Sequence, residues 1–213
     1  GTEMYSTGYI CRNPNRNDQM HHYDMNLNYI DELLWHFQYD ADTAYMRKMW
    51  PVIKRHLAWE KLNFDSDNDH LYDAYCCIWA SDALYYSDGA VTHSSAYNYR
   101  GNLLAAKIAE KIGEDAEPYR REAEAIRKAM NDRLWLEGKD AYVPNPTDIM
   151  TGKRTVTPNH WAEYQDKMGH QRKHADAALW SVYTPIDCGV GNPSQMYEAT
   201  RYVTSHIPHI DVE

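Results

Sequence analysis

Several features are scarce in this sequence of 213 residues. It has 2 Phe against 18 Tyr and 7 Trp, so nearly all its aromatic rings carry a polar group. A core needs no such bias, because Phe packs as well and needs no hydrogen-bond partner when buried. Flat amphipathic rings suit a ligand with apolar faces edged by hydroxyls, as in sugars. Composition alone does not decide between a sugar-binding surface and a compositional bias with ordinary surface tyrosines.

Basic charge and long apolar runs are scarce too. Lys and Arg number 22 against 31 Asp and Glu, which gives a formal net charge of −9. Nucleic acid and anionic membranes need a basic surface, so neither is expected as a partner. No apolar run approaches the length of a membrane span. The chain starts with Gly1, and we expect a processed form or a part of a longer protein.

The four cysteines form no metal or redox motif. They are Cys11, Cys76, Cys77 and Cys188, with no Cys-x-x-Cys and no Cys/His spacing suited to zinc. We expect the pair at 76–77 to pack as small buried residues. No cofactor is predicted. The cysteine count does not decide the cellular compartment, for which a periplasmic or secreted location is the expectation.

Strand-like alternation is absent and helical periodicity dominates. Apolar spacing predicts helices over 27–37, 46–57, 97–112, 119–134, 174–183 and 196–207. Gly113 is placed to end one helix in a left-handed turn, and Asn192 to begin another with Gln195 completing a capping box. Pro51 predicts a kink or break. The proline-rich stretch 142–158 reads as a long ordered loop.

Three stretches could carry chemistry. His22, Asp24, Asn26 and Asn28 crowd the start of the first helix, where amides can recognise hydroxyls or simply cap the helix. Asp82 is a lone carboxylate near Trp79, and an apolar setting raises the pKa of a general acid; capping a short helix is the alternative. His93 and Tyr97 follow as candidate substrate-binding residues.

The third stretch is the acidic run Asp65–Asp73. Asp65, Asp67 and Asp69 alternate as in a calcium loop, but His70 stands where an EF-hand needs Gly, and Cys76 where it needs Glu. We therefore predict an acidic turn whose carboxylates accept backbone amides and no EF-hand or other assigned metal site, a looser calcium site being the alternative.

The order of these motifs resembles the six-hairpin glycosidase superfamily. The Asn-x-Asn pair at 26 and 28 is similar to one in the active site of the α-L-fucosidase branch, and the chain resembles a bacterial glycoside hydrolase-like family distantly related to that branch. The run 49–60 resembles the following outer helix. The run 65–72 resembles an acidic turn, usually Asp-x-Asp-Gly-x-Leu-Tyr, and 93–135 the next helix pair. His70 departs from that pattern, and the Ser-Pro-Glu-Asn type motif is not intact.

The resemblance implies an all-α fold of paired antiparallel helices that forms part of an (α/α)6 toroid. It places the general acid between the acidic turn and the next helix pair, where Asp82 fits best and Asp88 and Asp73 are reserves. Twelve helices need more than about 300 residues, so residues 1–213 are expected to form one domain of about half a toroid. The remainder of the toroid or a second copy would close it.

The predicted function is hydrolysis of oligo- or polysaccharide with inversion. Asp82 would protonate the leaving oxygen, Asn26 or Asn28 would position water, and Trp79, Tyr97 and their neighbours would stack on sugars. One alternative is a polysaccharide lyase using Tyr97, His93, Asn98 and Arg100. The other is a non-catalytic domain for carbohydrate binding or assembly.

Overall fold

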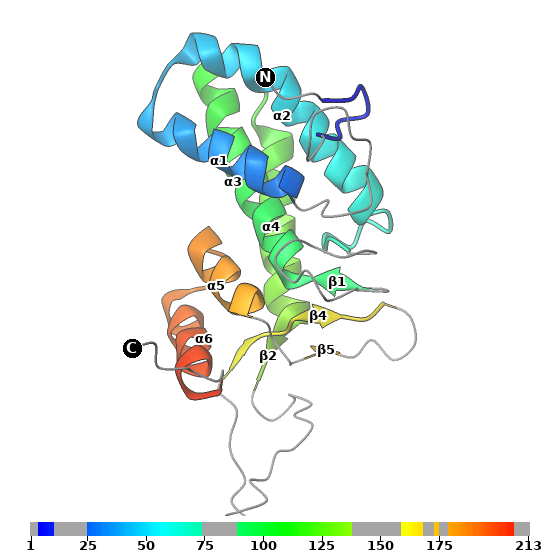
Figure 1. Cartoon of the computed structure of the whole chain (residues 1–213), viewed down its shortest axis with the longest axis vertical. Coiled ribbons are helices and arrows are strands. Elements are labelled where there is room, and N and C mark those ends of the chain that lie inside the picture. Colours follow the sequence, from blue (N-terminus) through cyan, green and yellow to red (C-terminus); the bar gives the residue numbers. More distant parts are fainter. Residues whose placement is uncertain are drawn as a thin grey trace, which may run out of the picture.

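A computed structural model describes residues 4–10, 25–73, 89–137, 159–167, 173–174 and 179–206 (Figure 1). Its helices are α1 (Met25–Tyr39), α2 (Thr43–Phe64), α3 (Thr92–Ile112), α4 (Glu117–Ala129), α5 (Leu179–Cys188) and α6 (Pro193–His206), and a π-helical turn, η2 (Met130–Leu134), follows α4. The strands are two residues each: β1 (Ala90–Val91), β2 (Trp135–Leu136), β3 (His160–Trp161), β4 (Tyr164–Gln165) and β5 (Lys173–His174). The predicted all-α class is confirmed.

Helix α2 runs past its proline without interruption. Asp42 caps it, its Oδ1 accepting the backbone N–H groups of Ala44 at 2.9 Å and Tyr45 at 3.0 Å. Pro51 lies inside the helix on its exposed side. A proline removes one intrahelical hydrogen bond, and the burial of Trp50 and Ile53 on the other side offsets that loss. Of the kink or break predicted at Pro51, the break is therefore wrong, and the kink stays a prediction.

Two predicted helix boundaries are confirmed by their caps. Gly113 ends α3 with φ at 79°, a left-handed conformation that suits a residue without a Cβ atom. Before α6, Asn192 Oδ1 accepts the N–H of Gln195, and Gln195 Oε1 accepts the N–H of Asn192, both at 3.0 Å. This reciprocal pair is the capping box read from the sequence.

Helix α5 differs from its predicted range of 174–183. Residues 173–174 form β5, and the helix begins only at Leu179 and continues through Pro185 to Cys188. Cys188 is buried and forms no disulfide. The predicted loop over 142–158 and the pair Cys76–Cys77 lie outside the described residues.

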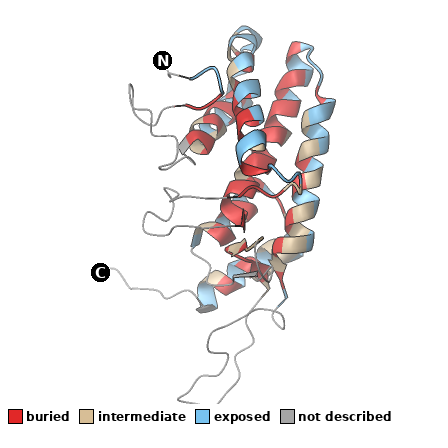
Figure 2. Cartoon of the chain, turned by 90° about the vertical axis from the view of Figure 1, so that its right-hand side faces the viewer, coloured by how far each residue is buried: buried red, intermediate tan, exposed pale blue. Residues whose placement is uncertain are grey.

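The helices form successive pairs around α3, which packs against α1, α2, α4 and α5 (Figure 1). Helix α6 covers α5 and the strand β3. Buried residues lie on the facing sides of the helices and exposed ones on their outer sides (Figure 2). Within the described ranges, no helix is both long and apolar enough to cross a bilayer.

Two apolar clusters make up most of the core. One joins α1, α2 and the second half of α3, with Leu34, Ile53 and Ile108 at its centre. The other joins the first half of α3 to α4, α5, α6 and the strands, and includes Ile126 and Trp161. Each fully buried side chain of this size contributes about 2 kcal/mol by leaving water.

A small antiparallel sheet fixes the start of α3. Strand β4 lies between β1 and β5, with Ala90 opposite Gln165 and Val91 opposite Tyr164. Gly89 has φ at 110°, and a Cβ atom there would lie 2.2 Å from the carbonyl oxygen of Gln165. Only glycine fits that approach. The sheet thereby holds the segment 159–167 against the first turn of α3.

Candidate functional site

An arginine on α3 links three helices. The Arg100 guanidinium donates two hydrogen bonds to Asp31 of α1, at 2.7 and 2.6 Å. It also donates to the Asp187 carboxylate of α5 at 2.5 Å and to the Asp187 carbonyl at 3.3 Å. The Arg100 side chain is 9% exposed and that of Asp31 12%, while the Asp187 side chain is 59% exposed. This bidentate geometry is the strong form of a charge-assisted pair.

Two aromatic rings lie close to this guanidinium. Its central carbon is 5.7 Å from the ring centre of Trp35 and 5.6 Å from that of Tyr97. Trp35 is 43% exposed, so part of its ring can meet a ligand. We call Asp31, Trp35, Tyr97, Arg100 and Asp187 the arginine junction.

Burial and charge shift the pKa values of the junction in definite directions. Burial raises the pKa of the Asp31 carboxyl, although the hydrogen bonds from Arg100 oppose the rise. Burial disfavours the charged guanidinium, but Asp31 raises the pKa of Arg100 above its ordinary value. Burial first and the nearby Asp31 charge second raise the pKa of Tyr97. Tyr97 is therefore a neutral hydroxyl at physiological pH and a poor base.

The predicted residue His93 lies next to the junction. It is buried in the first turn of α3, with its ring edge-to-face against Tyr97 at 5.0 Å between centroids. Its Nδ1 lies 3.3 Å from the Thr184 hydroxyl oxygen of α5. The structure thus places His93 against Tyr97 with a partner from α5, and the contact of both residues with a substrate stays a prediction.

A buried carboxylate that the sequence analysis missed lies near the same end of α3. Glu163 is 4% exposed and accepts a hydrogen bond from the Ser181 hydroxyl at 2.9 Å. Its backbone carbonyl accepts the N–H of Thr92 at 3.2 Å, which ties it to α3. A glutamate in a segment without periodicity gives no sequence signal, so only the fold reveals its burial.

The two asparagines of the Asn-x-Asn pair have different surroundings. Asn26 is buried, and its Oδ1 accepts the N–H of Ile10 at 2.6 Å, which holds the segment 4–10 against α1. Asn28 is half-buried and precedes Asp31 and Trp35 by three and seven residues, spacings that share one helix face. Asn28 therefore lies on the junction side of α1. Asn26, two residues earlier, lies on a different side of the helix.

The remaining predicted site residues are outside the described part of the chain. They are His22, Asp24, Trp79 and Asp82, together with the reserve Asp88. The other reserve, Asp73, is buried with its carboxylate 2.8 Å from Lys167 Nζ. That ion pair favours the charged form of Asp73, whereas a general acid must carry a proton.

The acidic turn has the predicted backbone contacts. Asp69 Oδ1 accepts the N–H of Leu71 at 2.9 Å, and Asp65 Oδ1 accepts that of His70 at 3.2 Å. His70 has φ at 63°, in the left-handed region that favours glycine. Although burial opposes it, the hydrogen bond from Arg133 lowers the pKa of Asp69.

Lysine ammonium groups lie among the carboxylates that could hold a metal. The oxygen and nitrogen atoms of Asp65, His70 and Glu122 lie within 4.8 Å of one another. Lys61 Nζ contacts Asp65 and lies 2.9 Å from Glu122 and 3.3 Å from the His70 ring. A cation of the chain thus already balances these charges, and a divalent ion would have to displace it.

The lyase alternative fits these contacts poorly. It needs Arg100 to neutralise a uronate, but that guanidinium is buried and already paired with two aspartates. Asn98 is 1% exposed and donates to Glu60 at 3.4 Å and to the Ser94 carbonyl at 3.0 Å. Neither side chain faces a polymer.

Two solved structures share this fold over part of their length. A GH78 family rhamnosidase of Bacillus sp. GL1 matches 87% of this chain with a TM-score of 0.65 at 15% identity. A rhamnosidase from Klebsiella oxytoca, with rhamnose bound, matches 95% of it with a TM-score of 0.63 at 18% identity. No protein-family model and no curated protein sequence matches the chain.

The match corrects the expected relation to the fucosidase branch and shows how much of each neighbour this chain spans. Both neighbours are rhamnosidases, so the likeness supports a glycoside hydrolase-like fold but not the fucosidase branch. The chain spans 17% of the first protein and 35% of the second. Because both sequence identities are below 20%, the similarity concerns the fold alone.

Proposed function

We propose that this chain is a glycoside hydrolase-like domain that offers the arginine junction to a carbohydrate. The observation that carries the proposal is the exposed aromatic face at the meeting of α1, α3 and α5, in a fold shared with two rhamnosidases. Because the chain spans a minor part of each neighbour, activity would belong to a larger assembly of which this domain is one part.

The junction has the groups that a neutral sugar needs. The Trp35 ring, 43% exposed, offers an apolar face for the C–H side of a pyranose. The Asp187 carboxylate, 59% exposed, can accept sugar hydroxyls while Arg100 holds it in place. Two carboxylates at the site would repel a uronate. A neutral oligosaccharide is thus favoured over the anionic polymer of the lyase alternative.

For catalysis we propose the roles read from the sequence. Asp82 donates its proton to the leaving oxygen as the glycosidic bond breaks, and a water molecule attacks the anomeric carbon from the opposite side. Asn28, or Asn26, holds that water, and a carboxylate outside this chain accepts its proton. Such inversion needs the acid and base about 6.5–9.5 Å apart. His22, Asp24, Trp79, His93 and Tyr97 would contact the sugar.

Carbohydrate binding without turnover is the second candidate. The small share of each neighbour that the chain spans favours it for the isolated chain, since half a cleft can bind a sugar without holding both catalytic groups. The two candidates share a binding surface and differ in the need for Asp82.

Binding is tested with Trp35→Ala and a matched control. We expect rhamnose and neutral oligosaccharides to shift the NMR signals of α1 and α5, and Trp35→Ala to weaken binding about tenfold through lost stacking. Tyr197→Ala removes another exposed ring, 65% exposed on α6, and should leave binding unchanged. Equal weakening by both variants, or no binding by the wild type, would contradict the junction as the site.

Turnover is tested on the longest protein that contains this chain, with a panel of aryl and natural glycosides. We expect Asp82→Asn to lower kcat at least about 100-fold, as loss of a general acid does. Asp132→Asn changes an aspartate that is 56% exposed on η2 and should retain activity as the matched control. Full activity in Asp82→Asn would remove Asp82 from the mechanism, and sugar binding without any turnover would favour the binding domain.

A further inference from the structure

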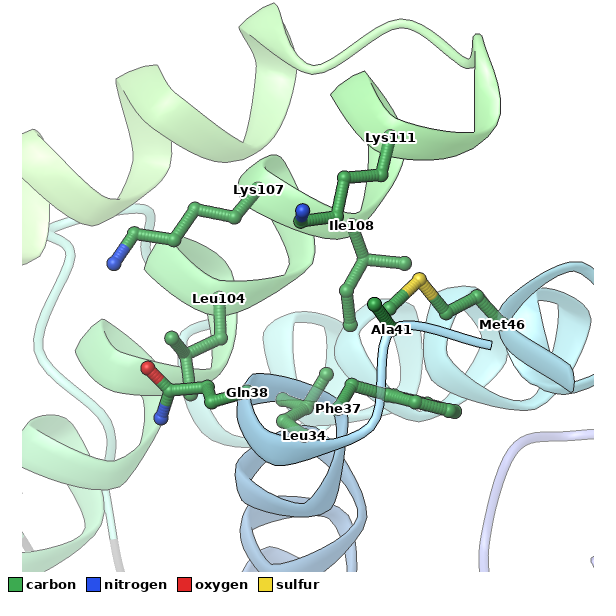
Figure 3. A pocket seen from close by; sticks show the side chains of 9 residues that line it. All are labelled: Leu34, Phe37, Gln38, Ala41, Met46, Leu104, Lys107, Ile108 and Lys111. Carbon is green, nitrogen blue, oxygen red and sulfur yellow. The ribbon is translucent and has the colours of Figure 1, made fainter. Parts of the chain in front are cut away.

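A pocket of about 240 Å³ opens at the far end of α1 and α3 from His93 (Figure 3). Lys107 comes 14 residues after His93 on the same helix, which corresponds to about 21 Å along its axis. None of the five residues of the arginine junction lines this pocket, although Leu34 adjoins Trp35 in the sequence and Leu104 follows Arg100 by about one helical turn. Its lining consists of Leu34, Phe37, Gln38, Ala41, Met46, Leu104, Lys107, Ile108 and Lys111.

The floor of this pocket is apolar and its rim is basic. Leu34 and Phe37 of α1 and Ile108 of α3 are buried core residues, and they meet around the hollow. Lys107 and Lys111 lie one turn apart on α3, and both are exposed. In Figure 3 the ends of Lys107 and Gln38 lie at the same edge of the pocket.

These two ammonium groups have no carboxylate partner among the described residues. The nearby Glu110 pairs instead with Arg120. Two aspartates flank the lining residue Ala41, but both are engaged with backbone amides. Asp42 caps α2, and Asp40 Oδ1 accepts the N–H of Asp42 at 3.1 Å. In a chain of net charge −9, this is an apolar pocket with unpaired positive charge at its rim.

We propose that this pocket binds a small organic carboxylate with an apolar body, such as an aryl-acetic acid. The ring would lie among Phe37, Leu104 and Ile108, and the carboxylate would meet Lys107 and Lys111. The positive charge at the rim favours an anionic ligand, and the apolar floor favours one whose remaining atoms are apolar. The ligand would join α1 to α3 and so stabilise the fold that carries the arginine junction.

The test uses sodium phenylacetate as the probe and the neutral phenylacetamide as its isostere. We expect phenylacetate to raise the Tm of the whole chain and to shift the methyl NMR signals of Leu34, Leu104 and Ile108. Phenylacetamide should bind at least fivefold more weakly, because it lacks the charge. Equal affinity for the two compounds would overturn the proposal.

Variants separate the pocket from the rest of the surface. Lys107→Gln/Lys111→Gln should weaken phenylacetate binding at least fivefold. Lys48→Gln/Lys54→Gln removes the same charge from exposed positions on α2 and should not change it. Ala41→Trp fills the pocket from an exposed rim position and should abolish binding while the fold is retained.

Three results would overturn the proposal. One is unchanged phenylacetate binding in the Lys107/Lys111 variant. Another is the absence of shifts at the pocket methyl groups. The third is a concentration-dependent dimer that Ala41→Trp dissociates, without phenylacetate binding, which would assign the pocket to a second copy of this chain.

Discussion

The first half of α3 buries hydroxyls, an imidazole and an amide, whereas the second half buries leucine, isoleucine and alanine. Thr92, His93 and Asn98 are each at most 4% exposed, and their partners come from distant segments: residues 162–163, α5 and α2. Leu104 and Ile108 need no such partners. A polar group is buried at low cost only when a partner meets it, so the first half depends on accurate packing and the second on apolar contact alone.

This contrast suggests where the helix serves function. The polar half faces the aromatic and charged groups of the arginine junction, and the apolar half has the stripe of an ordinary amphipathic helix with one hollow beside it. Substitutions in the two halves should therefore lower stability for different physical reasons.

The largest effect is expected from Arg100→Gln. The change leaves Asp31 buried without its counter-ion, and removal of one partner of such a pair costs about 3 kcal/mol. Urea unfolding at neutral pH measures this loss. The loss should shrink at acidic pH, because protonated Asp31 needs no counter-ion. Arg127→Gln removes an arginine that is 44% exposed and paired with Glu124, and should cost less than about 0.5 kcal/mol.

In the apolar half, Leu104→Ala should cost about 2 kcal/mol. Leu104 is 5% exposed, and its truncation loses apolar burial and enlarges the existing pocket. Unlike Arg100→Gln, this loss should be independent of pH, which unfolding curves at two pH values will show. Leu62→Ala truncates a leucine that is 75% exposed and should be nearly neutral.

Acidification tests the buried polar side of α2, which faces the first half of α3 through Glu60 and Asn98. Burial lowers the pKa of His56 from its ordinary value of 6.5 to about 3. The unfolded chain therefore binds a proton between those values while the folded chain does not. Stability from His56 is complete above pH 6.5 and falls by about 1.4 kcal/mol for each pH unit below it. In His56→Gln that part of the pH dependence should disappear; an unchanged slope would contradict the buried neutral imidazole.

The smallest effect is expected from divalent metals. The acidic turn is tied to the polar half of α3 by the bond from the Tyr72 N–H to Ser95 Oγ, at 2.9 Å. Because Lys61 and Lys167 already balance its carboxylates, calcium or a chelator should leave the Tm unchanged. A calcium-dependent rise would show that the ion displaces a lysine. Lys61→Met, which frees Asp65 and Glu122, should show such a rise.

Local patterns predicted much of the fold. The stripe through Ile53 and Leu57, the left-handed end at Gly113 and the capping box at Asn192 are each set by residues within about one helical turn. The break at Pro51 was wrong because burial on the opposite side of α2 outweighs one lost hydrogen bond. The early start predicted for α5 was wrong because β5 pairs with β4 there.

The candidate site was predicted only in part. The proximity of His93 and Tyr97 follows from the sequence, since they lie one turn apart on one helix, and their role in binding stays a prediction. Asp31 and Glu163 were missed, because nothing in their local sequence distinguishes them from solvated carboxylates. The roles of Asp82 and of the other proposed residues at 22, 24 and 79 stay predictions.

The sequence alone thus determined most of the helices and the ends at Gly113 and Asn192, because backbone hydrogen bonding and side-chain periodicity act over a few residues. Only the tertiary structure decided that Arg100 meets Asp31, 69 residues before it, and Asp187, 87 residues after it. Such contacts depend on how α1, α3 and α5 pack against one another, and this is fixed by the fit of their buried surfaces.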